Sequence, residues 1–258
     1  MTDMSVATFA PARDRAPSVL RIGDVFSRSR KMYAAHWAAY TGIVTIANAP
    51  FLAIGAIGGY LATIGRQATP SAIGAAIVGG LFALACLMLA HAAIYAGVSQ
   101  EISGRPFAFG QSISAALRRS PAFLALILLL WLYAALAVLL LVIPALIVLC
   151  VYVVAFPACI VERLGPIQSL SRSAFLTKGN RWRIFGLLIV LYLGTALASQ
   201  LIIFLAKLAG GAIFSALVSL PIQGFVGSFS AVTIGVLYAQ LRVAREGVDI
   251  EPIAKVFD

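Results

Sequence analysis

The residues able to do chemistry inside the apolar part of this chain are few. The 258 residues include two histidines and nine Asp and Glu residues, and we find no acid inside a long apolar segment. The strongly polar side chains that do fall there are one asparagine, one histidine and two glutamines: Asn48, His91, Gln200 and Gln223. Polar and ionisable groups at membrane depth mark functional sites by default. They also serve as hydrogen-bonding glue between helices, so both interpretations stay open.

The sequence contains no constellation typical of an enzyme. Hydrolases and transferases need clustered acids, a histidine beside a nucleophile or a phosphate-binding glycine loop, and none of these patterns occurs. The cysteines Cys86, Cys150 and Cys159 are odd in number, lie in apolar runs and lack metal-ligand spacing. We therefore predict a non-catalytic protein with no catalytic, cofactor-binding or metal-binding residue.

The elements that position the polar residues are predicted to be membrane-spanning helices. The chain is 62% hydrophobic and 11% charged, with a mean hydropathy of +1.00, whereas a soluble domain is about half apolar and about a quarter charged. A spanning helix needs about 20 mostly apolar residues. Six segments are candidates: about 36–64, 72–99, 121–142, 144–161, 184–205 and 213–241. The predicted fold is all-α, a polytopic membrane helix bundle of about six transmembrane helices.

Prolines are expected to divide several of these segments. Residues 122–161 carry no charge, and this stretch is too long for one span, so we place a turn at Pro144. A single kinked helix, giving five spans, is the alternative. Pro121 suits the first position of a helix. Residues 48–50 (Asn-Ala-Pro) and Pro221 predict interruptions in the first and last spans. Freed carbonyls there can line a solute path, but proline kinks are common in membrane helices and can serve packing alone.

Positive charge is concentrated on one side of these spans. With six spans, 17 of the 19 Lys and Arg residues and all nine acids fall on the side of both termini, and only Arg66 and Lys207 fall on the other. The positive-inside rule then makes both termini cytoplasmic, in a bacterial inner membrane. The start of the chain lacks the apolar core of a cleavable signal peptide. We divide the chain into a cytoplasmic arm (1–17), one membrane domain (18–246) and a cytoplasmic tail (247–258).

A short pattern occurs three times on the cytoplasmic side, each time before a pair of spans. Its centres are Phe26, Ile113 and Leu170, and a serine follows each of them. Apolar residues recur at helical spacing within each stretch, which favours an amphipathic helix in the headgroup plane. We interpret the chain as three tandem units, each an interfacial helix followed by a helical hairpin. Chance similarity between short sequences of low diversity is the alternative.

The basic residues near these stretches are the candidate contacts for a partner. In a soluble protein a net charge of +10 would suggest nucleic acid, but no basic module with base-stacking aromatic residues is present. Basic residues beside spans attract anionic lipid headgroups. The predicted headgroup or protein contacts are Arg28, Arg30, Lys31, Arg118, Arg119, Arg163, Arg172, Lys178, Arg181, Arg183, Arg242 and Arg245.

The third stretch and its flanks are the most distinctive part of the sequence. Gly165 and Pro166 predict a helix start, and residues 178–180 (Lys-Gly-Asn) predict a left-handed helix end. Glu162 and Arg163, just before this helix, are interpreted as a surface ion pair.

Residues 162–185, together with the ending at 237–247 and the start near 22–33, resemble the glycerophosphoryl diester phosphodiesterase membrane-domain family and its uncharacterised six-span bacterial relatives. In that family the membrane module is sometimes fused to a catalytic barrel domain. Since no such domain follows before Asp258, the resemblance implies neither phosphodiesterase activity nor a catalytic residue.

The sequence thus favours a membrane scaffold, or a module that binds lipids or a partner, with a basic cytoplasmic face. The expected partners are anionic headgroups on the cytoplasmic side and a protein, either a different chain or a second copy; no cofactor is expected. The alternative is a transporter or channel for a small or lipidic solute, which requires Asn48, His91 and Gln223 to face one cavity. A lipid-hydrolysing enzyme built on Glu162 is a third hypothesis.

Overall fold

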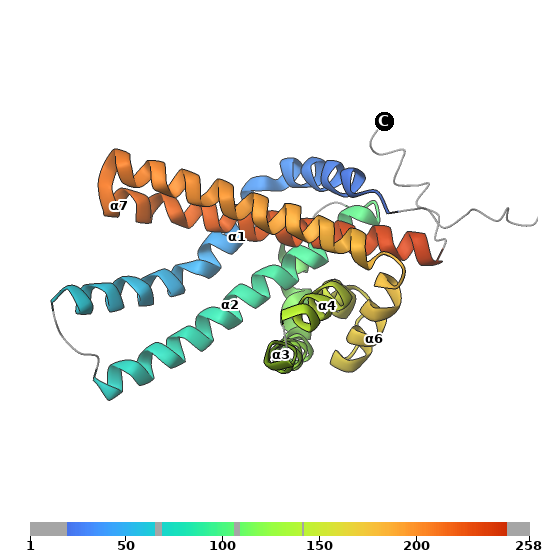
Figure 1. Cartoon of the computed structure of the whole chain (residues 1–258), viewed down its shortest axis with the longest axis horizontal. Helices are drawn as coiled ribbons and strands as arrows, with labels where there is room; N and C mark the ends of the chain where they lie inside the picture. The colour runs from blue at the N-terminus through green and yellow to red at the C-terminus, as the bar shows by residue number, and fades with distance from the viewer. Residues whose placement is uncertain (1–19, 65–68, 106–108, 141, 247–258) are drawn as a thin grey trace, which may run out of the picture.

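The computed structural model describes residues 20–64, 69–105, 109–140 and 142–246 (Figure 1). Within these ranges the chain forms seven helices and no strand, so the predicted all-α polytopic fold is confirmed. The helices are α1 (Ile22–Thr63), α2 (Pro70–Ile102), α3 (Phe109–Leu140), α4 (Val142–Tyr152), α5 (Ala155–Val161), α6 (Pro166–Thr177) and α7 (Arg181–Glu246). The predicted arm and tail lie outside the described residues.

Five helical segments are long and apolar enough to cross a membrane. They are Ile22–Leu61, Pro70–Ile102, Gly110–Leu136, Arg181–Gly211 and Phe214–Glu246. The fourth predicted span corresponds to a shorter apolar segment, Ala145–Val161, which is divided where α4 ends at Tyr152 and α5 begins at Ala155.

α1 consists of two helices joined at His36. The backbone angles of His36, φ −133° and ψ 27°, are not helical. This joint lies where the sequence placed the start of the first span. It separates the amphipathic stretch that begins at Ile22 from the apolar part of the helix.

The three amphipathic stretches bury equivalent positions. In each stretch two residues four apart are buried: Val25 and Ser29, Ser112 and Ala116, Ser169 and Ser173. Residues four apart lie on one face of a helix. The serine after each centre is exposed in all three stretches. The alignment read from the sequence therefore matches a common buried face.

The second stretch differs from the other two because it continues into its span. α3 passes through Pro121 without a break, so the predicted helix start at Pro121 is wrong. Proline cannot donate to the carbonyl four residues earlier. That carbonyl, on Leu117, instead accepts a hydrogen bond of 2.9 Å from the Ser120 hydroxyl, which explains how the helix tolerates the proline.

The other predicted proline interruptions are also wrong or displaced. Asn48, Pro50 and Pro221 lie inside helices, and the non-helical backbone angles of these helices are at other residues. Packed spanning helices tolerate proline because nearby groups satisfy the freed carbonyl. Pro144 does not divide this region as expected, because α3 ends at Leu140 and α4 begins at Val142. Pro144 lies in the first turn of α4, where its missing N–H removes no helical hydrogen bond.

α7 is a helical hairpin. Its chain reverses at Gly210 and Gly211, and the φ of Gly211 is +70°, a left-handed conformation that glycine adopts without steric cost. We call Arg181–Gly211 the first arm and Phe214–Glu246 the second arm. Figure 1 shows the two arms side by side, with the N-terminal stretch of α1 above them and the rest of α1 and α2 below them. The C-terminal part of α3 is seen nearly end-on there, so the α3–α4 hairpin runs in a different direction.

The second arm forms the centre of the packing. Glycines on this arm allow close approach of the first two helices: a Cβ at Gly224 would collide with the Thr45 hydroxyl of α1, and one at Gly235 would lie 2.9 Å from Cγ1 of Val98 of α2. Large side chains of the arm, including Leu237 and Leu241, are fully buried. This core fixes the ends of the helices, where the charged residues gather.

Candidate functional site

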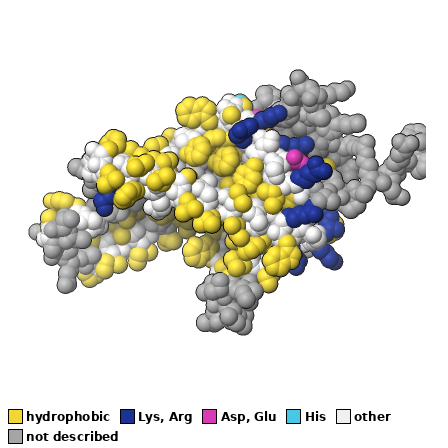
Figure 2. Space-filling view, turned by 45° about the horizontal axis from the view of Figure 1, so that its top comes forward, with side chains coloured by type: hydrophobic (Ala, Val, Ile, Leu, Met, Phe, Trp, Pro, Cys, Tyr) yellow, Lys and Arg dark blue, Asp and Glu magenta, His cyan; other side chains and the backbone are white. Residues whose placement is uncertain are grey.

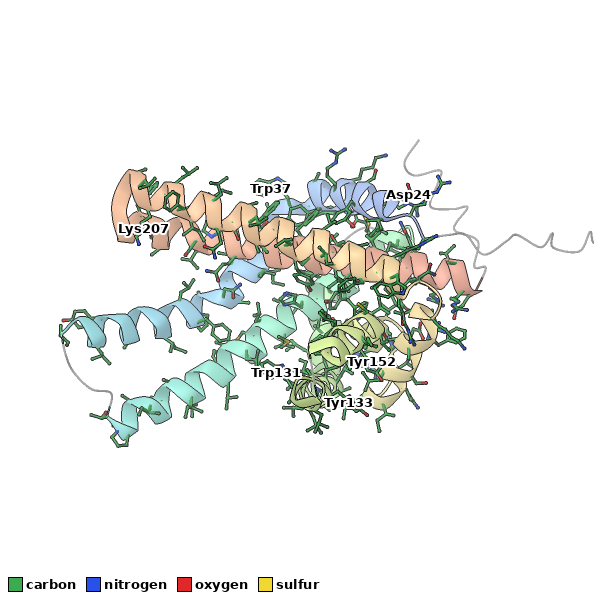
Figure 3. All side chains as sticks on the ribbon, viewed as in Figure 1. Asp24, Trp37, Trp131, Tyr133, Tyr152 and Lys207 are labelled. Carbon is green, nitrogen blue, oxygen red and sulfur yellow. The ribbon has the colours of Figure 1, made fainter. Side chains whose placement is uncertain are left out.

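Charged side chains gather at one end of the molecule. The space-filling view in Figure 2 shows Lys and Arg side chains at the end where α6 and the last turns of α7 lie, and a predominantly apolar surface elsewhere. Asp24 and Lys207, labelled in Figure 3, lie at opposite ends. We call the end that contains Asp24 the basic end. It corresponds to the side that the charge pattern predicts to be cytoplasmic.

A cluster of five side chains, which we call the clamp, joins α6 to the second arm at this end. The clamp consists of Glu162, Arg172, Tyr238, Arg242 and Glu246. Nε of Arg172 donates to both carboxylate oxygens of Glu162, at 2.9 and 2.8 Å, and its terminal nitrogen donates to Glu246. Tyr238 donates its hydroxyl to Glu162 at 2.6 Å, and Arg242 donates to Glu246 at 2.9 Å. One arginine therefore bridges two acids that are 84 residues apart in sequence.

Local structure places each member of the clamp. Glu162 is the C-cap of α5, and Arg172 lies two turns into α6. Tyr238, Arg242 and Glu246 follow one another at intervals of four residues on the second arm, so they lie on one face of the helix. The helix that carries Arg172 begins at Pro166, with Gln168 accepting from the Gly165 amide at 3.2 Å. The predicted start of this helix is confirmed.

The end of α6 is tied to the same arm. Gly179 has a φ of +90°, which confirms the predicted left-handed helix end. Arg245 donates to the carbonyl of Lys178, and its guanidinium lies 5.6 Å from the ring centre of Phe175. The guanidinium of Arg172 lies 5.9 Å from the centre of the same ring. The middle of α6 and its C-terminal end are therefore held to α7.

The clamp neutralises its own charges. It contains two carboxylates and two guanidinium groups, and the side chains of Glu162 and Arg172 are only 17% and 20% exposed. Burial works against the charged form of Arg172, but the hydrogen bonds that it donates to Glu246 and Glu162 outweigh this effect and raise the pKa of the arginine. The predicted ion pair between Glu162 and Arg163 is wrong. Arg163 adopts a left-handed φ of 56° and is exposed, while Glu162 is paired with Arg172.

A carboxylate outside the clamp, that of Glu101, lies beside the joint of α1 at His36. Glu101, in the last turn of α2, accepts a hydrogen bond of 3.2 Å from Tyr40 and lies 3.7 Å from Nε2 of His36. On the other side of the joint, the hydroxyl of Tyr33 bonds to those of Thr41 and Ser228. The first amphipathic stretch is therefore fixed to α2 and to the second arm.

The structure sorts the twelve predicted basic contacts into two groups. Arg172 and Arg242 are in the clamp, Arg245 donates to a backbone carbonyl, and Arg183 donates to the Leu20 carbonyl at 3.1 Å. The others have no acidic partner within the described ranges, and all except the half-buried Arg119 are exposed. They are Arg28, Arg30, Lys31, Arg118, Arg119, Arg163, Lys178 and Arg181.

We call these eight residues the free basic residues. Two exposed tryptophans lie close to members of this group in the sequence. Trp182 is 85% exposed and directly follows Arg181, and Trp37 is 60% exposed and directly follows the joint of α1. Tryptophan is enriched at membrane–water interfaces, where its ring sits at the level of the headgroups.

The predicted intramembrane polar residues do not form one site. The Asn48 amide donates to the Val44 carbonyl, and Nδ1 of His91 donates to the Leu87 carbonyl, both within their own helices. Nε2 of His91 faces the second arm, 3.9 Å from a Cβ placed at Gly227. Gln200 and Gln223 are exposed on the α7 hairpin. The transport alternative required these polar residues to face one cavity and the helices to be interrupted near Pro50 and Pro221. The helices continue through both prolines.

Sequence reasoning missed Tyr238, Glu246, Tyr40 and Glu101 as site residues. The spacing of four residues between Tyr238, Arg242 and Glu246 was a readable signal that these side chains share a face. Their partner on α6 has no signal in a single sequence, because a long-range ion pair leaves no local pattern.

Neither a metal site nor a relative points to an activity. Within the described ranges, no group of three or more His, Cys, Asp or Glu side chains could hold a metal ion. Comparisons of the chain with protein-family models, curated proteins and solved structures find no match.

Proposed function

We propose that this multi-pass membrane protein is a non-catalytic module that gathers anionic phospholipid at its basic end. In this proposal the basic end faces the cytoplasm of a bacterial cell and both termini are cytoplasmic. One observation carries the proposal. The acids Glu101, Glu162 and Glu246 are engaged within the molecule, whereas the eight free basic residues have no acidic partner in the part of the chain that the structure describes.

The energetics favour lipid as the partner of these residues. A basic residue beside an anionic membrane surface contributes about 1 kcal/mol of attraction. Lys178 and Arg181 flank the left-handed turn at Gly179 and precede the exposed Trp182. Their combined attraction of about 2 kcal/mol corresponds to a local preference for anionic lipid of about 30-fold. Glu101, Glu162 and Glu246 are already paired within the molecule, so among the described acids only the exposed Asp24 adds unpaired negative charge at this end.

The test uses the fluorescence of Trp182. A protein with Trp37→Phe and Trp131→Phe retains Trp182 as its one tryptophan, since the chain has three. It is reconstituted into vesicles of equal parts phosphatidylglycerol and phosphatidylcholine, with bromine on the chains of one lipid at a time. We expect brominated phosphatidylglycerol to quench Trp182 more strongly than brominated phosphatidylcholine, and 1 M salt to weaken the difference because the screening length falls to about 3 Å.

A matched pair of variants shows whether the basic end is responsible. Lys178→Gln with Arg181→Gln is expected to remove the preference. Arg66→Gln with Lys207→Gln removes the same charge from the side predicted to be external and is expected to preserve it. Equal quenching by the two lipids in the parent protein would refute the proposal, and a stoichiometric protein bound to the same residues would favour a scaffold for that protein instead.

A further inference from the structure

Two glutamines lie at the same depth in the α7 hairpin. Gln200 comes ten residues before Gly210, and Gln223 comes twelve residues after Gly211. With a rise of about 1.5 Å per residue, both lie about 15–18 Å from the turn. Lys207 marks the end of the hairpin that carries this turn (Figure 3). The glutamines therefore lie at the level of the hydrocarbon core, which is about 30 Å thick.

The side chains of these glutamines have no partner among the described residues. Both are exposed, and neither makes a hydrogen bond to the described part of the chain. Three other polar side chains of the hairpin are satisfied locally: the hydroxyls of Thr195, Ser199 and Ser219 donate to carbonyls of their own helix at 2.6, 2.9 and 2.8 Å. A lipid chain offers no hydrogen bond, so an amide at this depth needs a partner from protein.

Gln200 lies on the free side of the first arm. Nine residues separate it from the buried Leu191, about two and a half helical turns, so the two side chains point in opposite directions. Ala196, one turn earlier on the same side, is small and exposed, and small residues let the backbones of two spanning helices approach closely. Gln223 is exposed as well, but the adjoining Gly224 packs on Thr45 of α1, so α1 already occupies part of the surface beside Gln223.

We propose that two copies of this chain associate through the first arm of α7, with Gln200 of each copy hydrogen-bonded to its counterpart. A twofold contact brings a residue on the axis against itself. A primary amide both donates and accepts, so it satisfies its own copy. A lysine or a carboxylate in that position would instead repel its counterpart. The contact lies away from the basic end and does not depend on lipid binding there.

The experiment measures association in vesicles. Full-length protein labelled separately with donor and acceptor dyes is reconstituted in phosphatidylcholine at a series of protein densities, and energy transfer gives the dimer fraction. We expect Gln200→Leu to weaken association about tenfold and Gln200→Asn, which keeps the amide, to preserve it. Gln223→Leu removes an amide at the same depth from the other arm and is expected to have no effect.

Three results would overturn the proposal. The first is a monomer at every density, and the second is a dimer that Gln200→Leu leaves intact or that Gln223→Leu abolishes instead. The third is a different protein that co-purifies in stoichiometric amount and is lost in Gln200→Leu. Retained secondary structure and melting temperature in each variant would show that a loss of association does not reflect misfolding.

Discussion

The clamp predicts a strong energetic coupling between Glu162 and Arg172. The Nε–H of the guanidinium is shared between the two oxygens of one carboxylate, and both side chains are about four-fifths buried. Removing one partner of a fully buried pair costs about 3–5 kcal/mol, whereas an exposed pair contributes about 0–1 kcal/mol. At this intermediate burial we expect Glu162→Gln and Arg172→Gln each to lower the free energy of unfolding by about 2–3 kcal/mol. We expect the double variant to be far less destabilised than the sum of the two.

The assay is a double-mutant cycle on the protein in mild detergent. Reversible unfolding by increasing mole fractions of dodecyl sulfate gives the free energies, and we expect a coupling of about 2 kcal/mol. Hydrogen exchange of the α6 amides should rise in the same variants, because the helix is held through Arg172. Arg242→Gln is the matched control: this arginine also pairs with Glu246 but is 43% exposed, so its loss should cost only about 0.5 kcal/mol. A coupling below about 0.5 kcal/mol would refute the reasoning, since the pair would then behave as an exposed one.

Three further predictions concern the joints and the packing. Glu101→Gln should lower the free energy of unfolding by about 1–2 kcal/mol, measured in the same titration, because the adjacent hydroxyl and imidazole lose their charged acceptor. Gly224→Ala should lower the free energy of unfolding by about 1–3 kcal/mol because its Cβ would collide with the Thr45 hydroxyl. Gly194→Ala has open space around it and should raise the free energy of unfolding by about 0.5–1 kcal/mol. Equal effects of the two substitutions would contradict the packing of Gly224 on α1. Arg163→Gly should be stabilising, by about 0.5–1 kcal/mol, because glycine adopts a left-handed φ without strain, and a loss of stability would argue against that backbone conformation.

Most of the helical architecture could be predicted from the sequence because its causes are local. Apolar length determines where the spans lie, and the glycines at 179, 210 and 211 mark reversals that a left-handed or flexible backbone requires. Proline was the misleading signal. In a soluble protein, a proline inside a helix usually breaks or kinks it. In this structure Pro121 stays within α3, and the Ser120 hydroxyl donates to the Leu117 carbonyl in place of the missing N–H of the proline.

The candidate site was less accessible from the sequence. Glu162 was noticed, but sequence adjacency suggested Arg163 as its partner, and the left-handed backbone at that position accompanies a different pairing. The true partners come from α6 and from the end of α7, and their meeting depends on how α7 folds back as a hairpin. The sequence placed twelve basic residues in one group, and it could not separate those engaged within the molecule from the eight that have no acidic partner among the described residues, because both kinds have the same local surroundings.

The continuous course of α3 has a mechanical consequence. In α1 and between α6 and α7, a non-helical joint separates the amphipathic stretch from the span that follows, and hydrogen bonds rather than continuous helix connect the two. α3 has no such joint and acts as a rigid lever. When the thickness of a bilayer changes, spanning helices adapt by tilting. We therefore expect a tilt of the α3 span to move its amphipathic stretch with it, whereas in the other two units the stretch and the span are separate helices that can change their angle to each other.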